Sequence, residues 1–300
     1  STYILPNNCG DDIIRVEQLC EAIKLVYASA FFKAARAYIQ TTVHVTEEEK
    51  MAVVIQKLVG NYFGERFYPM FSGVAQSYNF YPVAPLERED GIASVALGLG
   101  RIVVEGEKVL SFSPRYPKVI PGFSTTKEIL KNSQKHFYAL NMAKTCFDLS
   151  MGDDVTLLKL DIPEAEMNGT LDMLASTYDA NDDRLRDGVG SPGPKVITFA
   201  GILKYGMLPM VDILRELLLI GHKGMGRPVE IEFAGGMGED GKPEFYVLQV
   251  RPIVTLREHR QVVIEEGEKA DAFIYTVKAL GNGVLKDIRD VVFVPPESFD

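Results

Sequence analysis

Four polar side chains in the last quarter of the sequence could together do chemistry. Glu230 and Glu232 stand in "VEIEF", and Gln249 and Arg251 stand in "LQVRP". Carboxylate and amide oxygens are ligands that Mg²⁺ prefers, and a guanidinium presents a fork of donors that fits phosphate or carboxylate. The combination therefore indicates a site for a metal ion and an anionic group.

The two stretches are expected to be antiparallel strands joined at a glycine-containing tip. Alternate residues of a strand share a face, so Glu230 and Glu232 should point one way and Ile231 and Phe233 the other. In the second strand, alternation predicts one face with Phe245, Val247, Gln249 and Arg251, and an opposite face with Tyr246, Leu248 and Val250. Two carboxylates, an amide and a guanidinium should then converge on one surface.

Such a surface suits the magnesium complex of a nucleoside triphosphate. Glu232 and Gln249 can supply metal ligands, while Arg251 stays charged and can bind phosphate. The alternative is a cross-strand Glu–Arg pair on a solvated sheet face, which would contribute roughly 0.2–1 kcal/mol. The pattern alone leaves both hypotheses open.

The glycines of the tip follow the spacing Gly236-x-Gly238-x-x-Gly241. A dinucleotide-binding fingerprint needs such glycines between a strand and the start of a helix, because the helix N-terminus holds the pyrophosphate. Here Pro243 and a predicted strand follow instead. We interpret the run as a flexible hairpin tip.

Composition excludes several classes of protein. The 300 residues carry a net charge of −9 without clustered basic stretches, which argues against nucleic-acid binding. No stretch has the length and apolarity of a membrane span or a secretory signal. The three cysteines follow no metal-binding spacing, so we expect a reduced, cytoplasmic protein. No GxSxG, HExxH or phosphate-loop motif supports a hydrolase, a zinc protease or a P-loop enzyme.

Hydrophobic spacing predicts the elements that position these residues. A helix capped by Asp11 or Asp12 should run to Tyr38 and pack one broad face on a sheet. A second helix should cover residues 208–221. Strand-forming stretches occupy residues 51–59, 67–77, 92–100 and 108–113, the first two as a hairpin. Two basic residues, Lys57 and Arg101, are further candidates for the site, although each could be an ordinary surface residue.

Five segments follow one another along the chain: "LCEAIKLVYASAFFKAARAYI", "MAVVIQKLV", "FSGVAQSYN", "ASVALGLGRIVVEGEKV" and "VEIEF...EFYVLQVRPIV". In this order they resemble the ATP-binding domain of phosphoenolpyruvate synthase and pyruvate phosphate dikinase. The resemblance is strong in the last segment, good over residues 16–108 and thin over residues 109–226. It covers about half of the chain.

The resemblance implies an α+β, ATP-grasp-type fold, a largely antiparallel sheet packed with helices, with ATP and Mg²⁺ as cofactors. In this family ATP phosphorylates a histidine on a swivelling domain, which carries the phosphoryl group to pyruvate in a distant barrel. By position, Glu232 resembles the metal-binding carboxylate and Glu230 the acidic residue near nucleotide or metal. Gln249 resembles the amide beside metal and phosphates. Arg251 resembles the arginine on the terminal phosphates and would act in phosphoryl transfer.

The family pattern also leads to expectations about domain organisation. Residues 1–254 should form the second lobe of the nucleotide-binding domain, the first lobe lying upstream, and residues 255–300 an extension or the start of another unit. Pyruvate or phosphoenolpyruvate would then meet other domains of the parent protein, and the fragment alone should turn over nothing. The sequence indicates no oligomeric state.

Two other functions remain possible at this level. Arg101 stands where the family usually has an acidic residue after Gly-Leu-Gly, which favours a non-catalytic regulatory or assembly module with a degenerate ATP-grasp fold. The second is an ATP-grasp ligase that joins a carboxylate to an amine. Such a ligase should lack the "LQVRP" ending and the "VYASAF" helix.

Overall fold

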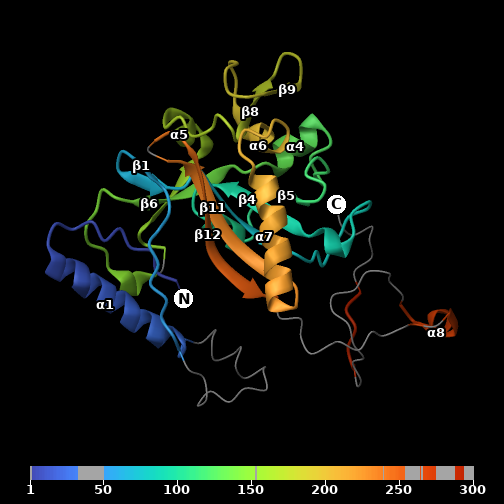
Figure 1. Cartoon of the computed structure of the whole chain (residues 1–300), viewed down its shortest axis with the longest axis horizontal. Helices are drawn as coiled ribbons and strands as arrows, with labels where there is room; N and C mark the ends of the chain where they lie inside the picture. Colours follow the sequence, from blue (N-terminus) through green and yellow to red (C-terminus); the bar gives the residue numbers. More distant parts are fainter. Residues whose placement is uncertain are drawn as a thin grey trace.

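The computed structural model describes residues 2–32, 51–152, 154–238, 240–253, 264, 266–274 and 288–293. Within these ranges the chain forms three antiparallel sheets with helices packed around them (Figure 1). The predicted α+β class is confirmed. Residues 273–296, whose composition predicts two more strands, are described only at residues 273–274 and 288–293, and neither of these ranges is strand.

The largest sheet has five strands and carries the polar residues of interest. Its order is β12–β11–β3–β4–β5 with every neighbouring pair antiparallel, so β12 is an edge strand. The strands are β3 (Phe71–Gln76), β4 (Ile92–Leu97), β5 (Leu110–Phe112), β11 (Val229–Met237) and β12 (Pro243–Pro252). The strands predicted within residues 92–100 and 108–113 are confirmed.

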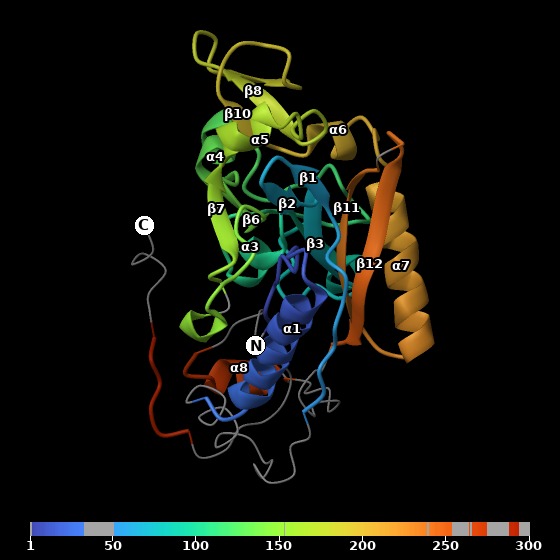
Figure 2. The ribbon, with the colours of Figure 1, turned by 90° about the vertical axis from the view of Figure 1, so that its left-hand side faces the viewer.

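One face of this sheet forms the core. Helix α7 (Met210–Met225) lies along it, against β11, β12 and β3 (Figures 1 and 2). The helix turns Met210, Leu214 and Leu218 inward at one-turn spacing, which confirms the helix predicted over residues 208–221. The strands contribute buried side chains at alternate positions: Phe71, Ala75, Ala93, Val95, Leu97, Ile231 and Phe233. On the other face, Glu230, Glu232, Gln249 and Arg251 lie toward the β12 edge, while Ala96 and Ala234 are buried further along it.

Two smaller sheets and several short helices complete the described part of the fold. The sheet β1–β2–β6–β7 consists of β1 (Asn61–Phe63), β2 (Arg66–Tyr68), β6 (His136–Asn141) and β7 (Leu157–Asp161). The sheet β10–β8–β9 consists of β8 (Ala175–Asp179), β9 (Arg184–Asp187) and β10 (Lys195–Ile197). The short helices are α3 (Arg101–Val104), α4 (Thr126–Asn132), α5 (Ile162–Met167), α6 (Ala200–Leu203), α8 (Glu266–Asp271), and the 3-10 turns η2 (Arg88–Asp90) and η3 (Leu149–Met151).

Helix α1 (Asp12–Ser29) begins where the sequence predicts. The Asp11 carboxylate accepts a hydrogen bond of 2.8 Å from the Ile13 N–H and so caps the helix. The helix ends at Ser29 and residues 30–32 form a turn, so the expected continuous helix to Tyr38 was wrong; residues 33–38 lie outside the described residues. The expected packing on a sheet was wrong, because Ile13 and Val16 are 70% and 59% exposed.

Helix α1 is held instead by irregular segments. It packs near η3, and the Gln18 amide donates to the Thr145 carbonyl at 2.6 Å. Only Ala22 and Ser29 of the helix are buried. Helical spacing of apolar residues thus predicted the helix correctly, but it could not specify what the apolar face contacts.

Residues 51–60 form no strand, contrary to the prediction of a hairpin with residues 67–77. A short hairpin forms later, between β1 and β2, where Gly64 takes a φ of +61° in the turn. Residues 51–60 are tied by a side chain instead, since the Gln56 amide donates to the Leu248 carbonyl at 3.1 Å. A segment rich in strand-forming residues forms a strand only where a partner strand is available to pair with it.

Candidate nucleotide-binding site

Strands β11 and β12 pair antiparallel, as predicted. Their register sets Glu230 opposite Arg251 and Glu232 opposite Gln249, so the structure brings all four polar residues together. The tip between the strands is a turn in which the Gly238 N–H donates to the Lys242 carbonyl at 2.8 Å. A strand, not a helix, follows this tip. The glycine run is therefore a hairpin tip and not a dinucleotide-binding fingerprint.

A bulge in β12 determines which face its polar residues take. The register shifts between Glu232 and Phe233: Gln249 is opposite Glu232, Val247 is opposite Phe233, and Leu248 is the extra residue between them. A bulge places two residues of one strand against one of the other, which reverses the alternation beyond it.

The predicted alternation within β12 was wrong in this respect. The Phe245 ring lies on the core side, where it stacks on Phe233 with the ring centres 5.2 Å apart. Gln249 and Arg251 lie on the opposite side, with Glu232 and Glu230. Without the extra residue, both polar side chains would share the face of Phe245 and meet the core.

Three residues on neighbouring strands form a polar ladder. Gln76 of β3 is opposite Glu230, which is opposite Arg251. The Gln76 amide donates to Glu230 Oε2 at 2.6 Å, and Arg251 Nε donates to Glu230 Oε1 at 2.7 Å. Arg251 Nη2 also donates to Oε1. Both oxygens of the Glu230 carboxylate are engaged, and its side chain is only 13% exposed.

Glu232 and Gln249 present a different environment. Within the described residues neither side chain makes a hydrogen bond or an ion pair, and Val74 of β3 is their neighbour on the inner side. Their oxygens are available to a ligand. No group of three or more His, Cys, Asp or Glu in the described part of the chain could hold a metal alone. This donor set therefore fits Mg²⁺ that takes its remaining ligands from phosphate and water.

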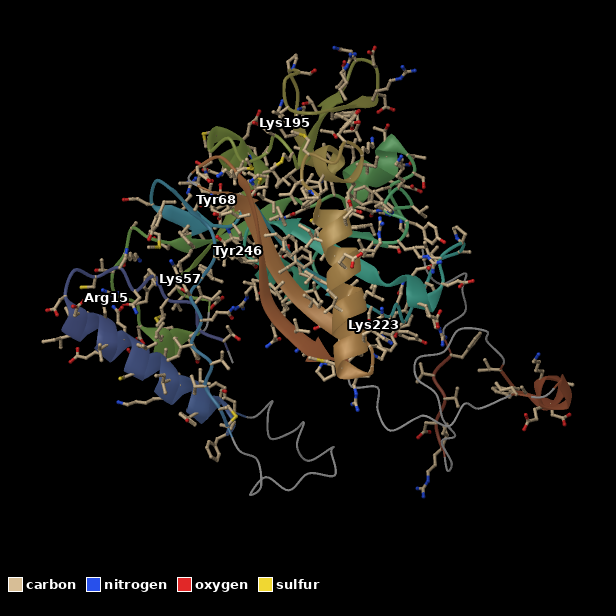
Figure 3. The ribbon with its side chains drawn as sticks, viewed as in Figure 1. Arg15, Lys57, Tyr68, Lys195, Lys223 and Tyr246 are labelled. Carbon is tan, nitrogen blue, oxygen red and sulfur yellow. The ribbon has the colours of Figure 1, made fainter. Side chains whose placement is uncertain are left out.

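The outer strand of the site is open to solvent, since Gln249 and Arg251 are exposed. Two of the clefts in the described part have volumes of about 360 Å³, beside Lys118 and Tyr205, and about 340 Å³, beside Ser111. None of the four polar residues lines either cleft. Lys57 is exposed and forms no hydrogen bond with them in the described residues (Figure 3).

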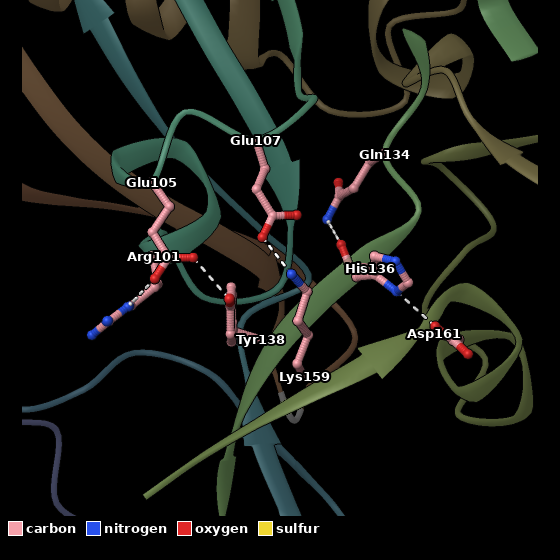
Figure 4. A network of polar contacts seen from close by, with 8 residues as sticks. All are labelled: Arg101, Glu105, Glu107, Gln134, His136, Tyr138, Lys159 and Asp161. Atoms are coloured by element: carbon pink, nitrogen blue, oxygen red, sulfur yellow. Dashed lines mark hydrogen bonds and ion pairs between the residues drawn. The ribbon is translucent and has the colours of Figure 1, made fainter. Parts of the chain in front are cut away.

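Arg101 is part of a separate polar network at the first turn of α3 (Figure 4). Its Nε donates to Glu105 Oε1 at 2.7 Å, and the Tyr138 hydroxyl donates to Glu105 Oε2 at 2.8 Å. The preceding Gly98 has a φ of +84°, and a Cβ there would lie 2.8 Å from the Tyr138 carbonyl oxygen. Close approach of β6, rather than approach of a ligand, therefore accounts for this glycine.

This network predicts a pH effect. The hydrogen bonds from Arg101 and then Tyr138 lower the pKa of Glu105 below its ordinary value of 4.5. A lowered carboxylate pKa stabilises the fold above the unfolded pKa, and this contribution is lost as pH falls through the folded pKa. Tyr138→Phe should raise the pKa of Glu105 and lower stability at neutral pH, with the difference vanishing in acid.

A carbon-13 NMR titration of the Glu105 carboxyl measures this shift. Tyr62→Phe is a suitable control, since Tyr62 is 66% exposed and lies on β1. An unchanged Glu105 titration in Tyr138→Phe would show that the hydroxyl does not hold the carboxylate.

Sequence reasoning missed one residue at the site, Gln76. A glutamine at a strand end carries no distinctive pattern, and its contact with Glu230 depends on the pairing of β3 with β11. These strands lie more than 150 positions apart in the chain, since the Gln76–Glu230 separation is 154 residues. Only the sheet order brings them together.

The fold and the site define an α+β domain with an oxygen-rich, arginine-containing sheet face. The sequence matches the pyruvate phosphate dikinase AMP/ATP-binding domain family over residues 12–272, so the chain belongs to this family. The resemblance seen in the sequence is confirmed, and the domain is of the ATP-grasp type. A search of curated proteins gives no match. Among the described residues, no helix combines the length and apolarity needed to span a membrane.

Proposed function

We propose that the chain binds Mg-ATP on the face formed by β11 and β12. Glu232 and Gln249 would supply oxygen ligands to Mg²⁺, and Arg251 would bind the terminal phosphates. Bound Mg²⁺ would supply charge neutralisation at the phosphates. Glu230 would stand next to the nucleotide and hold Arg251.

The observation that carries this proposal is the contrast between two pairs on one face. Glu230 and Arg251 are already bonded to each other, whereas Glu232 and Gln249 make no side-chain bond within the described residues. A purely structural cross-strand pair explains the first pair and leaves the second unexplained. Arg251 is 58% exposed, so its remaining N–H groups can reach an anion.

The proposal extends to the parent protein. Residues 1–254 would be one lobe of the nucleotide-binding domain of a cytoplasmic phosphotransferase, and residues 255–300 an extension. The bond between the transferred phosphorus and its bridging oxygen would break, with its electrons remaining on that oxygen of the departing nucleotide. A phosphorus–nitrogen bond would form on a histidine of another domain, and the imidazole would lose its ring proton to solvent. That domain would pass the phosphoryl group to pyruvate. Arg251 would stabilise the charge on the phosphates during transfer.

Arg251→Ala tests the proposed phosphate contact. A guanidinium that contacts only the terminal phosphates should matter for ATP and not for AMP. We expect the variant to bind Mg-ATP about tenfold more weakly and AMP within about twofold of the unchanged chain, the tenfold loss corresponding to about 1.4 kcal/mol. Isothermal titration with both nucleotides measures the two affinities.

Arg186→Ala is the matched control for this experiment. Arg186 also forms an exposed strand ion pair, with Asp179 at 2.9 Å, and is 54% exposed. It should leave both affinities unchanged. Equal weakening of ATP and AMP by Arg251→Ala would argue that the residue supports the fold and does not contact terminal phosphates.

A second candidate function is a non-catalytic regulatory or assembly module. The observation that favours it is Arg101, which stands where the family usually has an acidic residue. In the structure Arg101 forms an ion pair with Glu105. Such a module should give no heat of binding with ATP, ADP or AMP although it is folded by circular dichroism. Saturable binding of Mg-ATP would exclude this form of the hypothesis.

A further inference from the structure

Gln76 is a polar residue at the edge of the proposed site whose role is not explained by the family resemblance. We propose that Gln76 is a positioning residue for nucleotide binding: it fixes the Glu230 carboxylate and thereby orients Arg251. This inference rests on the proposed function and specifies how the phosphate-binding arginine is held in place.

The Glu230 carboxylate is held from two sides. Gln76 donates to one oxygen at 2.6 Å, and Arg251 donates to the other at 2.7 Å. Two strands on opposite sides therefore hold the carboxylate, which leaves it little freedom to rotate. Removing the amide would free one oxygen and release this restraint.

The two strands that flank Glu230 differ in how firmly the sheet holds them. Gln76 belongs to β3, which is paired on both sides, with β4 and β11. Arg251 belongs to β12, which is an edge strand, and its side chain is 58% exposed. The restraint on Arg251 therefore comes from Glu230, and the restraint on Glu230 comes from the interior strand.

Charge also favours an amide at position 76. An amide donor fixes Glu230 without adding charge, so the Glu230–Arg251 pair stays neutral overall before phosphate arrives. A second arginine at position 76 would compete with Arg251 for the carboxylate, and a carboxylate there would repel Glu230. Glutamine neither competes with Arg251 for the carboxylate nor repels Glu230, and its side chain does not titrate.

Gln76→Met in this chain tests the inference, because methionine keeps the approximate size and flexibility of glutamine and removes the donor. The Arg251 Nε–H resonance, assigned from its loss in Arg251→Ala, should shift and exchange faster with solvent. Mg-ATP should bind about fivefold more weakly, while AMP affinity stays within about twofold, since AMP lacks the phosphates that Arg251 contacts. A merely structural role would weaken both nucleotides alike.

Gln18→Met is the matched control. Gln18 also donates a 2.6 Å hydrogen bond, to the Thr145 carbonyl, together with a longer one of 3.6 Å to Cys146 Sγ, but it lies on α1. This variant should change neither the Arg251 resonance nor either affinity.

The outcomes separate the inference from the function on which it rests. An unmoved Arg251 resonance in Gln76→Met overturns the positioning role whatever the affinities are. A shifted resonance with unchanged Mg-ATP affinity also overturns it. If the unchanged chain binds no nucleotide, the proposed function fails. A shift of the Arg251 resonance in Gln76→Met would then show that Gln76 still positions Arg251, so that the failure lies in the proposed function alone.

Discussion

Glu232→Gln should abolish the Mg²⁺ dependence of ATP binding. The substitution keeps the shape of the side chain and removes the negative charge that would bind the metal. We expect Mg-ATP affinity to fall at least about tenfold, since even loss of an outer-shell partner costs roughly 10–100-fold in metal sites. ATP without metal should bind equally well or better, because the carboxylate no longer repels the phosphates.

Parallel titrations with and without Mg²⁺ measure this effect. Glu244→Gln is the matched control, since Glu244 is an exposed carboxylate on the same hairpin, near its tip. The control should retain the full Mg²⁺ dependence. If Glu232→Gln kept the Mg²⁺ dependence of ATP binding, Glu232 would not be a ligand of the metal.

Among the variants proposed for this chain, Phe233→Ala should lower the free energy of unfolding most. The Phe233 side chain is 1% exposed, stacks on Phe245 and lies against Gly73 across the sheet. Loss of a buried phenylalanine ring typically costs about 3–5 kcal/mol through lost burial and the cavity left behind. The effect should extend to the site, because Phe233 follows Glu232 directly and anchors the strand at the bulge.

Denaturant unfolding, followed by tyrosine fluorescence in a chain without tryptophan, measures the loss. Phe31→Ala is the matched control, since its ring is 65% exposed, and it should change the free energy of unfolding by less than about 1 kcal/mol. A comparable loss in both variants would contradict the assignment of Phe233 to the core that supports the site.

Sequence reasoning predicted the site residues but not all of their setting. Alternation within β11 correctly separates Glu232 from Phe233, because that strand is regular on the relevant side. In β12 the same rule fails at Leu248, since a bulge is a property of the paired strands and has no sequence pattern of its own here. The sequence thus predicted that the four polar side chains share one face, but it did not predict the bulge that places Gln249 and Arg251 there.

The long-range contacts were the least predictable part. Helical spacing predicted α1, yet Ile13 and Val16 of its apolar face are exposed, because spacing does not identify the surface that a helix meets. Residues 51–60 have strand-forming composition and no ladder partner in the described structure. Gln76 joins the site only through the pairing of β3 with β11. These features depend on which segments meet, and that information is distributed over the whole chain.

Nucleotide and metal should bind together on the β11–β12 face. Paramagnetic broadening of amide NMR signals by Mn²⁺-ATP tests it most directly, because Mn²⁺ accepts the same oxygen ligands as Mg²⁺. We expect the amide signals of Glu232 and Gln249 to broaden first, while those of Lys118 and Tyr205 beside the 360 Å³ cleft persist. Broadening centred on Lys118 and Tyr205, with sharp signals from Glu232 and Gln249, would contradict it.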